Sequence, residues 1–374
     1  MKIDSKMSTY YLKWLINTFY YISRYNQMKK MKTLILLPEL NRLHGIVLHY
    51  KGLQKYWNHD VEYFEIPKRK GIKHYISLLS NIVKFNLNLL TRRYSTIVFN
   101  TSLKAGFYTQ ILHFIIAKLL FYKTIVFIHG WDINSEHILN KKIARFFLQK
   151  TNAIIVLADS FKNKLNNVGI KTPVYVSCTK VDDELLGDFN IENKDIKEEF
   201  RFLYVSRIEK EKGILLSIDI FRELKKIFPK YTLHIVGDGS YMDNVKSYID
   251  DNDDGITICG RLEGKKLSDE YKNADFFFLQ SESEGLPAAL LEAMAFGLVP
   301  IVTPVGAIPE FFIDNVMGIM SNSQNVDFYI KRITSLSENN IKEISRYNYS
   351  YAQKHFLASR VAKSLEDVFK QTIK

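Results

Sequence analysis

From Lys32 onward, short apolar runs alternate with longer amphipathic segments, which is the pattern of doubly wound α/β proteins with parallel sheets. Runs bounded by polar residues are typical of strands buried on both faces. They predict strands at 33–37, 61–66, 96–99, 124–128, 152–157, 174–176, 200–205, 231–236, 256–259, 276–279 and 298–302. Helices are expected at 45–56, 75–90, 267–273 and 287–296. A further helix is expected after Asp159 or Ser160 as its N-cap, another begins at Ile214, and one or two amphipathic helices are expected within 341–372.

The alternation is interrupted once, by the acidic and weakly periodic segment 177–199. A domain boundary is expected there. The prediction is a first domain at 32–180, a linker at 181–199, a second domain at 200–355 and a final helix at 356–374 that packs back on the first domain.

Residues 1–31 form an N-terminal extension with an aromatic run at 10–22. This run is shorter than the roughly 20 apolar residues that span a bilayer. It predicts an amphipathic helix that lies on a membrane or on the first domain, unless Met31 is the natural start. The apolar span 111–128 is broken by Lys118 and Lys123 into a helix end and a strand, so no transmembrane segment is predicted.

The charge is divided unevenly along the chain. Residues 1–170 carry 26 Lys and Arg against 8 Asp and Glu, a net charge of +18, whereas residues 171–374 carry 26 against 32, a net of −6. A basic half suits nucleic acid, an anionic membrane or plain solvation. Basic residues mixed with long apolar segments, without a nucleic-acid-binding motif, favour peripheral association with the inner face of a membrane and no nucleic-acid partner.

The two cysteines, Cys178 and Cys259, have neither a disulfide framework nor a metal-ligand spacing, which suits a reducing cytoplasm. The acidic turn at 251–255 lacks the downstream glutamate of a calcium loop. No metal is therefore assigned.

Two carboxylates, Glu284 and Glu292, lie around the start of the helix predicted at 287–296. Pro287 suits its first turn, and the free N–H groups there form an anion site that fits a phosphate. Gly285 allows backbone to approach a ligand. The spacing predicts that the two carboxylates bind different parts of one ligand, rather than form an acid/base pair that flanks one bond. Ordinary acidic residues favoured by the helix dipole explain it equally well.

Other candidate groups follow predicted strands, at the sheet edge where α/β proteins bind ligands. Arg207 and Lys212 follow 200–205 and suit phosphate oxygens, and His129 follows 124–128. Taken singly, such charges are also typical of exposed surface, and a lone histidine is more often structural. The turn at Gly237 lacks the third glycine of a dinucleotide fingerprint.

Together, four motifs resemble the glycosyltransferase group 1 family of retaining, GT4-type enzymes: SRIEKEKG (206–213), HIVGDG (234–239), CGRL (259–262) and ESEGLPAALLEAMAFGLVPIVTPVGAIPE (282–310). The resemblance covers about residues 32–370. It implies an α/β GT-B fold, with two Rossmann-like doubly wound parallel-sheet domains facing a cleft. It also implies sugar transfer from a nucleotide-sugar to a lipid-linked or membrane-associated glycan acceptor in surface polysaccharide or lipopolysaccharide synthesis, without a metal or other cofactor.

The resemblance also implies roles for single residues. Arg207 and Lys212 would stabilise the leaving diphosphate, because fixed cations matter most where negative charge develops. His129 would lie near the transferred sugar and the acceptor. The remaining donor-side positions are Glu284 at the sugar hydroxyls, Glu292 at the ribose, Gly285, Leu286 and Pro287 near sugar and phosphate, Gly237, and Arg261 with Leu262 at the nucleobase.

The first half departs from the family pattern. The usual glycine pair after the first strand is His44–Gly45, so only Gly45 is expected near the phosphates. The linker's usual asparagine–glycine turn is Thr179–Lys180, to which we assign a structural meaning only. Two alternatives stay open: a non-catalytic sugar-nucleotide-binding assembly subunit and a GT-B-like sugar-nucleotide epimerase.

Overall fold

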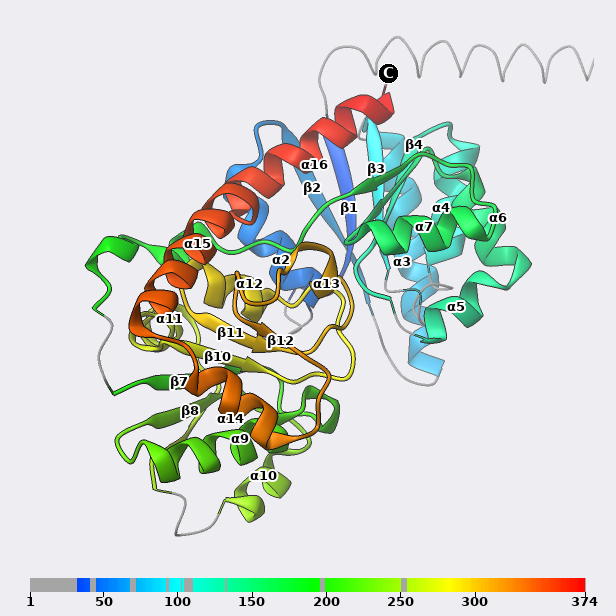
Figure 1. Cartoon of the computed structure of the whole chain (residues 1–374). Coiled ribbons are helices and arrows are strands. Elements are labelled where there is room, and N and C mark those ends of the chain that lie inside the picture. Colours follow the sequence, from blue (N-terminus) through cyan, green and yellow to red (C-terminus); the bar gives the residue numbers. More distant parts are fainter. Residues whose placement is uncertain are drawn as a thin grey trace, which may run out of the picture.

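The computed structural model describes residues 32–40, 45–67, 72–91, 94–101, 103, 110–131, 133–195, 199–249 and 254–373. The expectations for the N-terminal extension, for His44 and for most of the acidic turn at 251–255 lie outside these ranges. The chain forms two α/β units, each built on a parallel sheet with helices on both faces (Figure 1). This is the predicted fold class.

In the first unit, the described strands are ordered β2-β1-β3-β4-β5-β6. Leu34 to Leu37 and Ile125 to Ile128 are at most 1% exposed, because helices cover both faces of the sheet. The strands are β1 (Lys32–Pro38), β2 (Asp60–Ile66), β3 (Thr96–Thr101), β4 (Lys123–Ile128), β5 (Ala153–Val156) and β6 (Val174–Val176). The helices are α2 (Gly45–Leu53) with the 3-10 turn η1 (Gln54–Tyr56), α3 (Ile72–Thr91), α4 (Ile111–Leu119), α5 (Ile133–Leu139), α6 (Lys142–Lys150) and α7 (Asp159–Asn167).

In the second unit, the described strands are ordered β12-β11-β10-β7-β8-β9. Read from β9, this is the 3-2-1-4-5-6 order of Rossmann folds, whose ligand crevice lies between the first and fourth strands. The strands are β7 (Arg201–Val205), β8 (Thr232–Val236), β9 (Ile256–Gly260), β10 (Phe276–Leu279), β11 (Val299–Val302) and β12 (Ile319–Met320). The helices are η4 (Lys210–Lys212, a 3-10 turn), α9 (Ile214–Ile227), α10 (Met242–Tyr248), α11 (Gly264–Asn273), α12 (Ala288–Ala295), α13 (Ile308–Phe311), α14 (Val326–Thr334) and α15 (Glu338–His355).

The segment between the sheets contains a short helix, α8 (Asp183–Leu186), and a 3-10 turn, η3 (Ile191–Asn193). The C-terminal helix α16 (Ala358–Ile373) returns to the first unit and packs against α2, η1, β3 and β4 (Figure 1). Its carboxylate Glu366 is 1% exposed and accepts hydrogen bonds from Asn58 and from His59 Nδ1, the latter at 3.0 Å. One continuous apolar core therefore joins residues of both units.

One helix start differs from the sequence prediction. Asp159 and Ser160 are the first residues of α7 rather than its cap, and the N-cap position is Ala158, without a side-chain cap. Instead, Glu310 from the second unit accepts the N–H groups of Asp159 at 2.6 Å and of Ser160 at 2.9 Å. A carboxylate at a helix N-terminus satisfies orphan donors and complements the dipole. The prediction of a local cap is wrong because the cap comes from the facing unit.

None of the helices in the described part of the chain has both the length and the apolar content needed to traverse a bilayer.

Candidate active site

Two loops of the second unit meet at the switch point of its sheet. One follows β7 and carries Arg207 and Lys212, and the other follows β10 and carries Glu284. β7 and β10 are adjacent parallel strands, so both loops leave from the same edge. The topology therefore brings together residues that lie more than 70 positions apart in the chain.

Hydrogen bonds of buried polar side chains hold the loop after β10 in place. Gln280 is 4% exposed and donates to Ile301 O at 3.0 Å, while its Oε1 accepts from Tyr329 at 3.2 Å. Ser281 is 1% exposed, and its hydroxyl donates to Glu284 Oε1 at 2.8 Å. These bonds hold the Glu284 carboxylate in one orientation.

Lys212 and Glu284 form a shielded ion pair at 2.7 Å, with side chains only 11% and 12% exposed. The ammonium also donates to Ser283 O at 3.3 Å, so one of its three N–H donors is left for a further acceptor. Removing two charges from water costs free energy, so a buried ion pair is weak evidence for a contribution to stability. The pair therefore indicates a functional constraint. Arg207, on the same loop, is exposed.

Two glycines allow these loops to pack. Gly213, at φ +68°, would place a Cβ 1.9 Å from Gln280 O, and Gly237, at φ +143°, would place one 1.9 Å from Ser206 O. Neither position has room for a larger residue. Gly213 brings the β7 loop against the β10 loop, and Gly237 brings the turn after β8 against the β7 loop. Close packing of these loops therefore explains the glycine at position 237, apart from any contact with a ligand.

The segment Gly285–Pro287 contacts the first unit directly. A Cβ on Gly285 would lie 3.1 Å from His129 O, which places this backbone against the loop after β4. Leu286 and Pro287 are buried, and Leu286 O accepts from Thr179 Oγ1 at 2.9 Å. Pro287 is the N-cap of α12. The start of α12 therefore lies at the boundary between the units.

Glu292 lies inside α12 and is partly exposed. Its carboxylate accepts from Tyr271 OH at 2.9 Å. Burial raises the pKa of Glu292 to about 6, against the nearby charge of Lys180 and the bond from Tyr271. Lys180, assigned only a structural meaning from the sequence, is thus an electrostatic neighbour of a candidate site residue.

On the first unit, His129 belongs to a polar network at the ends of β3 and β4. Its Nε2 is 2.7 Å from Asn100 Oδ1, which also accepts from Tyr50 OH at 2.9 Å. Its ring stacks on Phe127, with centroids 3.8 Å apart. Next to it, His49 is 5% exposed, and burial together with Lys180 lowers the pKa of His49 to about 3. His49 is therefore neutral at physiological pH.

The remaining candidates are at the margins. Gly45 is exposed at the start of α2, and nothing lies within 4 Å of its Cβ position. Arg261 is 42% exposed and pairs with Glu263, while Leu262 packs against the core. The structure thus joins Lys212, Glu284 and the Gly285–Pro287 backbone to the His129 loop. It leaves Gly45 and Arg261 without a contact to that group among the described residues.

Sequence reasoning missed the supporting residues, namely Asn100, Thr179, Lys180, Tyr271, Gln280 and Ser281. Two of them, Asn100 in β3 and Tyr271 in α11, lie in elements without a motif, and the other four lie in loops. Thr179 and Lys180 could have been found from the sequence, since they replace the family's usual asparagine–glycine turn next to the site.

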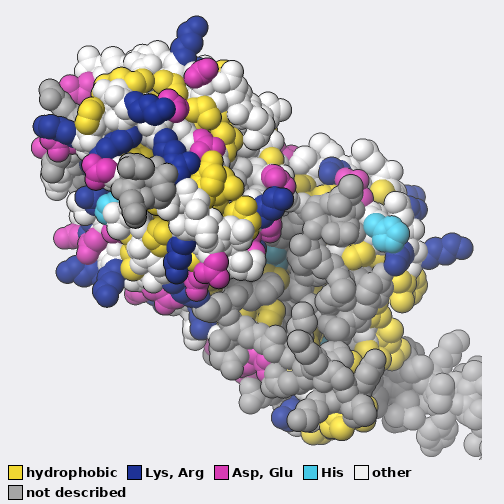
Figure 2. Space-filling model, turned by 90° about the horizontal axis from the view of Figure 1, so that it is seen from below, with side chains coloured by type: hydrophobic (Ala, Val, Ile, Leu, Met, Phe, Trp, Pro, Cys, Tyr) yellow, Lys and Arg dark blue, Asp and Glu magenta, His cyan; other side chains and the backbone are white. Residues whose placement is uncertain are grey.

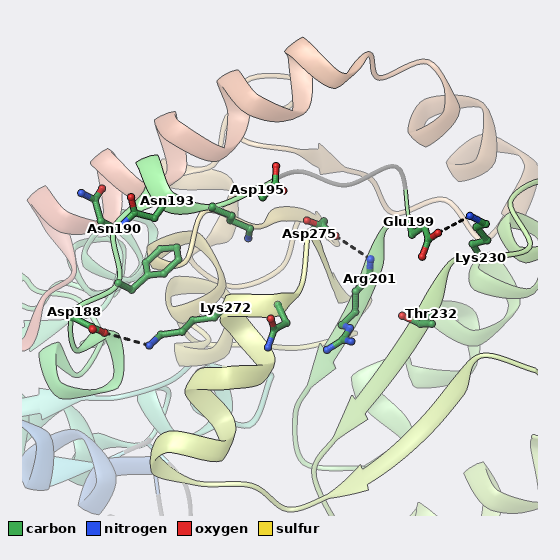
Figure 3. Close-up of a pocket in the computed structure, with 13 residues that line it drawn as sticks. Asp188, Asn190, Asn193, Asp195, Glu199, Arg201, Lys230, Thr232, Lys272 and Asp275 are labelled. Carbon is green, nitrogen blue, oxygen red and sulfur yellow. Dashed lines mark hydrogen bonds and ion pairs between the residues drawn. The ribbon is translucent and has the colours of Figure 1, made fainter.

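A separate hollow of about 550 Å³ lies at the opposite edge of the second sheet, near the amino ends of β7 and β8 (Figure 3). Its lining mixes both signs of charge, and the pairs Asp188–Lys272 and Glu199–Lys230 lie across it. Burial lowers the pKa of Lys194 to about 8, against Asp275. Because four of its eight charged lining residues pair with one another in this way, this hollow is a weaker candidate than the loops around Glu284.

Residues 188–355 match the family described as Glycosyl transferases group 1. Among curated proteins, the chain is 31% identical over 216 residues to the amylovoran biosynthesis glycosyltransferase AmsK of Erwinia amylovora, a match that spans 54% of this chain and only 52% of that one. It is 26% identical over 281 residues to the O-antigen biosynthesis glycosyltransferase WbnH of Escherichia coli, covering 74% and 77% of the two chains. Among solved structures, HepE of Anabaena in complex with UDP superposes with a TM-score of 0.69 at 15% identity, covering 91% of this chain and 100% of that one.

Proposed function

We propose that this protein is a retaining glycosyltransferase, because residues 188–355 match the glycosyl transferases group 1 family and the chain has the GT-B fold. It transfers a sugar from a nucleotide-sugar to a lipid-linked or membrane-associated glycan acceptor in surface polysaccharide or lipopolysaccharide synthesis. The names of the amylovoran and O-antigen relatives support this pathway class, and UDP in the HepE complex supports a nucleotide-sugar donor.

The observation that carries the proposal is the Lys212–Glu284 pair at the switch point of the second sheet. Glu284 Oε1 is engaged by Lys212 and by Ser281. This favours a role in holding sugar hydroxyls over a role as a free nucleophile. The remaining N–H donor of Lys212 and the exposed guanidinium of Arg207 supply positive charge for a diphosphate leaving group.

Under this proposal, the remaining candidate residues complete the donor site. The N–H groups at the start of α12 bind phosphate oxygens, aided by the helix dipole. Glu292 accepts the ribose hydroxyls, and the loop of Gly260, Arg261 and Leu262 faces the nucleobase. His129 lies across the boundary from Gly285 and faces the transferred sugar and the acceptor. On this proposal Arg207, Lys212 and the N–H groups at the start of α12 stabilise the leaving diphosphate in place of a metal.

The test combines donor binding with transfer. Binding of UDP and of a panel of UDP-sugars is measured by calorimetry, and transfer is measured to lipid-linked glycans extracted from the source membrane. We expect Arg207→Ala and Glu284→Gln each to lower transfer by about 100-fold or more, as loss of one preorganised charge-stabilising group does. Arg346→Ala is the matched control, because Arg346 is 64% exposed on α15 and pairs with Glu192.

Full transfer activity in both variants would contradict the site assignment. UDP-sugar binding without hydrolysis or transfer would instead identify a non-catalytic binding subunit. Conversion of the sugar while it stays on the nucleotide would identify an epimerase.

We also propose that the first unit lies on the inner, cytoplasmic face of an anionic membrane. Five aliphatic side chains follow one face of α3 at helical spacing and are exposed: Ile76 (66%), Leu79 (66%), Val83 (53%), Leu87 (57%) and Leu90 (67%). The same half of the chain carries the net charge of +18. By contrast, basic and acidic side chains are interspersed over the second unit (Figure 2). An apolar stripe on a basic domain is complementary to an anionic lipid surface.

Sedimentation with phosphatidylglycerol vesicles at low and high salt tests this. We expect binding at low salt that weakens at high salt and is reduced in Leu79→Glu/Leu87→Glu. Ile227→Glu is the control, because Ile227 is also exposed, at 53%, but lies on α9 of the second unit. Absence of sedimentation at both salt concentrations would refute the proposal.

A further inference from the structure

Three metal-ligating side chains converge in the second unit, outside the candidate active site. They are His234 on β8, Cys259 on β9 and Glu270 on α11. One potential ligand atom from each lies within 4.8 Å of the others. His234 Nδ1 is 2.7 Å from Glu270 Oε2 and 3.8 Å from Cys259 Sγ.

The adjacent strands β8 and β9 place two of the three groups on one face of the sheet. Ile235 pairs with Ile258, but the next residue, Val236, pairs with Gly260. His234 pairs with Thr257, and Cys259, two residues after Thr257, lies on the same face of β9, beside this register shift. Its thiol lies beside His234, which occupies the neighbouring strand.

The covering helix supplies the third group. The two side chains of the His234–Glu270 pair are 17% and 19% exposed, so they are shielded but remain accessible to an ion from solvent. Cys259 is also partly exposed. The sequence separations of 25 and 11 residues fit no short ligand motif, which is why the cysteine spacing gave no metal prediction.

The donor set fits a zinc ion. Imidazole nitrogen, thiolate sulfur and carboxylate oxygen are its usual ligands, with Zn–N near 2.0 Å and Zn–S near 2.3 Å. In a tetrahedron with these bond lengths, nitrogen and sulfur lie roughly 3.5 Å apart. The observed separation of 3.8 Å is close to this value. The His234–Glu270 separation needs to open by roughly 0.5 Å to admit the ion.

We propose that His234, Cys259 and Glu270 bind one Zn²⁺, with water as the fourth ligand. On binding, the Cys259 thiol loses its proton to solvent and a Zn–S bond forms, while His234 donates the Nδ1 lone pair and Glu270 one carboxylate oxygen. The thiolate and carboxylate together balance the charge of the ion, so the metal site as a whole is neutral.

The ion ties α11 to β8 and β9. Gly260 follows Cys259 directly, so the bound metal also fixes the start of the loop that contains Arg261 and Leu262. The site contains no residue of the Lys212–Glu284 group, so binding of the metal can be measured separately from the proposed glycosyl transfer.

Cobalt titration of the full-length protein, freed of metal by a chelator, tests the proposal. Co²⁺ replaces Zn²⁺ in such sites and reports a thiolate ligand through a sulfur-to-cobalt charge-transfer band. We expect this band to saturate at one equivalent and to disappear when Zn²⁺ is added. Cys259→Ser should abolish the band, and Glu270→Gln should weaken Co²⁺ binding by at least about 10-fold, since even outer-shell changes cost 10-fold to 100-fold.

Cys178→Ser is the matched control, because Cys178 is the other partly exposed thiol and lies by the carbonyl of His355. It should keep the band unchanged. Circular dichroism checks that each variant is folded. Loss of the band in Cys178→Ser, its persistence in Cys259→Ser, or no band in the wild type would overturn the proposal. None of these measurements uses a nucleotide-sugar, so the outcome is separate from that of the transferase assay.

Discussion

Glu292 has a stability cost that follows from its position inside α12. Burial raises its pKa from 4.5 to about 6, so the folded protein favours the protonated carboxyl. The sign follows from linkage. Below the unfolded pKa both states are protonated and no penalty exists, whereas above pH 6 folding must keep a carboxylate charged in a poorly solvated place. At ~1.4 kcal/mol per pH unit, this penalty reaches about 2 kcal/mol. That value is an upper limit, because Glu292 is partly exposed.

Glu292→Gln removes the charge and keeps an oxygen that accepts from Tyr271 OH. We expect the variant to be more stable than the wild type by up to about 2 kcal/mol at pH 8, with the difference fading below about pH 4. Urea unfolding at a series of pH values measures it, provided the slope with denaturant is unchanged. Glu343→Gln, the same substitution at an exposed position on α15, is the control.

The same variant should bind UDP more weakly if Glu292 holds the ribose. A gain of stability with a loss of binding is expected where a functional residue is kept at a cost. A variant that is less stable than the wild type at pH 8, or a difference that does not change with pH, would refute the reasoning.

Three further changes test contacts within and between the two units. Glu310→Ala removes the carboxylate that caps α7 from the other unit and should cost about 1 kcal/mol, measured by urea unfolding; an unchanged midpoint would contradict the capping role. Gly213→Ala should cost more than the 1–2 kcal/mol of a left-handed alanine, because its Cβ meets Gln280 O, and a smaller loss in thermal unfolding would show that the loops adjust. For Glu366, burial alone would raise the pKa, but hydrogen bonds, first from His59, lower it overall. Glu366→Gln should therefore cost about 2 kcal/mol at neutral pH. The wild type should lose this advantage as the pH falls through the folded pKa, and a difference that persists in acid would refute it.

The sequence by itself determined the layered architecture. Buried parallel strands need continuous apolar runs, and these are visible one segment at a time, as in 33–37 and 276–279. The Glu284–Glu292 region was also predictable, because a strand, a polar loop, Pro287 and a helix form a local unit. The observed helix, Ala288–Ala295, lies within the predicted range of 287–296.

Only the tertiary structure decided which distant side chains meet. The pairing of Lys212 with Glu284 follows from the adjacency of β7 and β10, and the cap on α7 comes from Glu310 in the other unit. The His234, Cys259 and Glu270 cluster depends on the adjacency of β8 and β9 and on the position of α11 beside them. The physical reason is common to all three. Periodicity reports whether a residue faces the core, but strand order, helix positions and the docking of two units decide which buried or half-buried polar groups must satisfy one another.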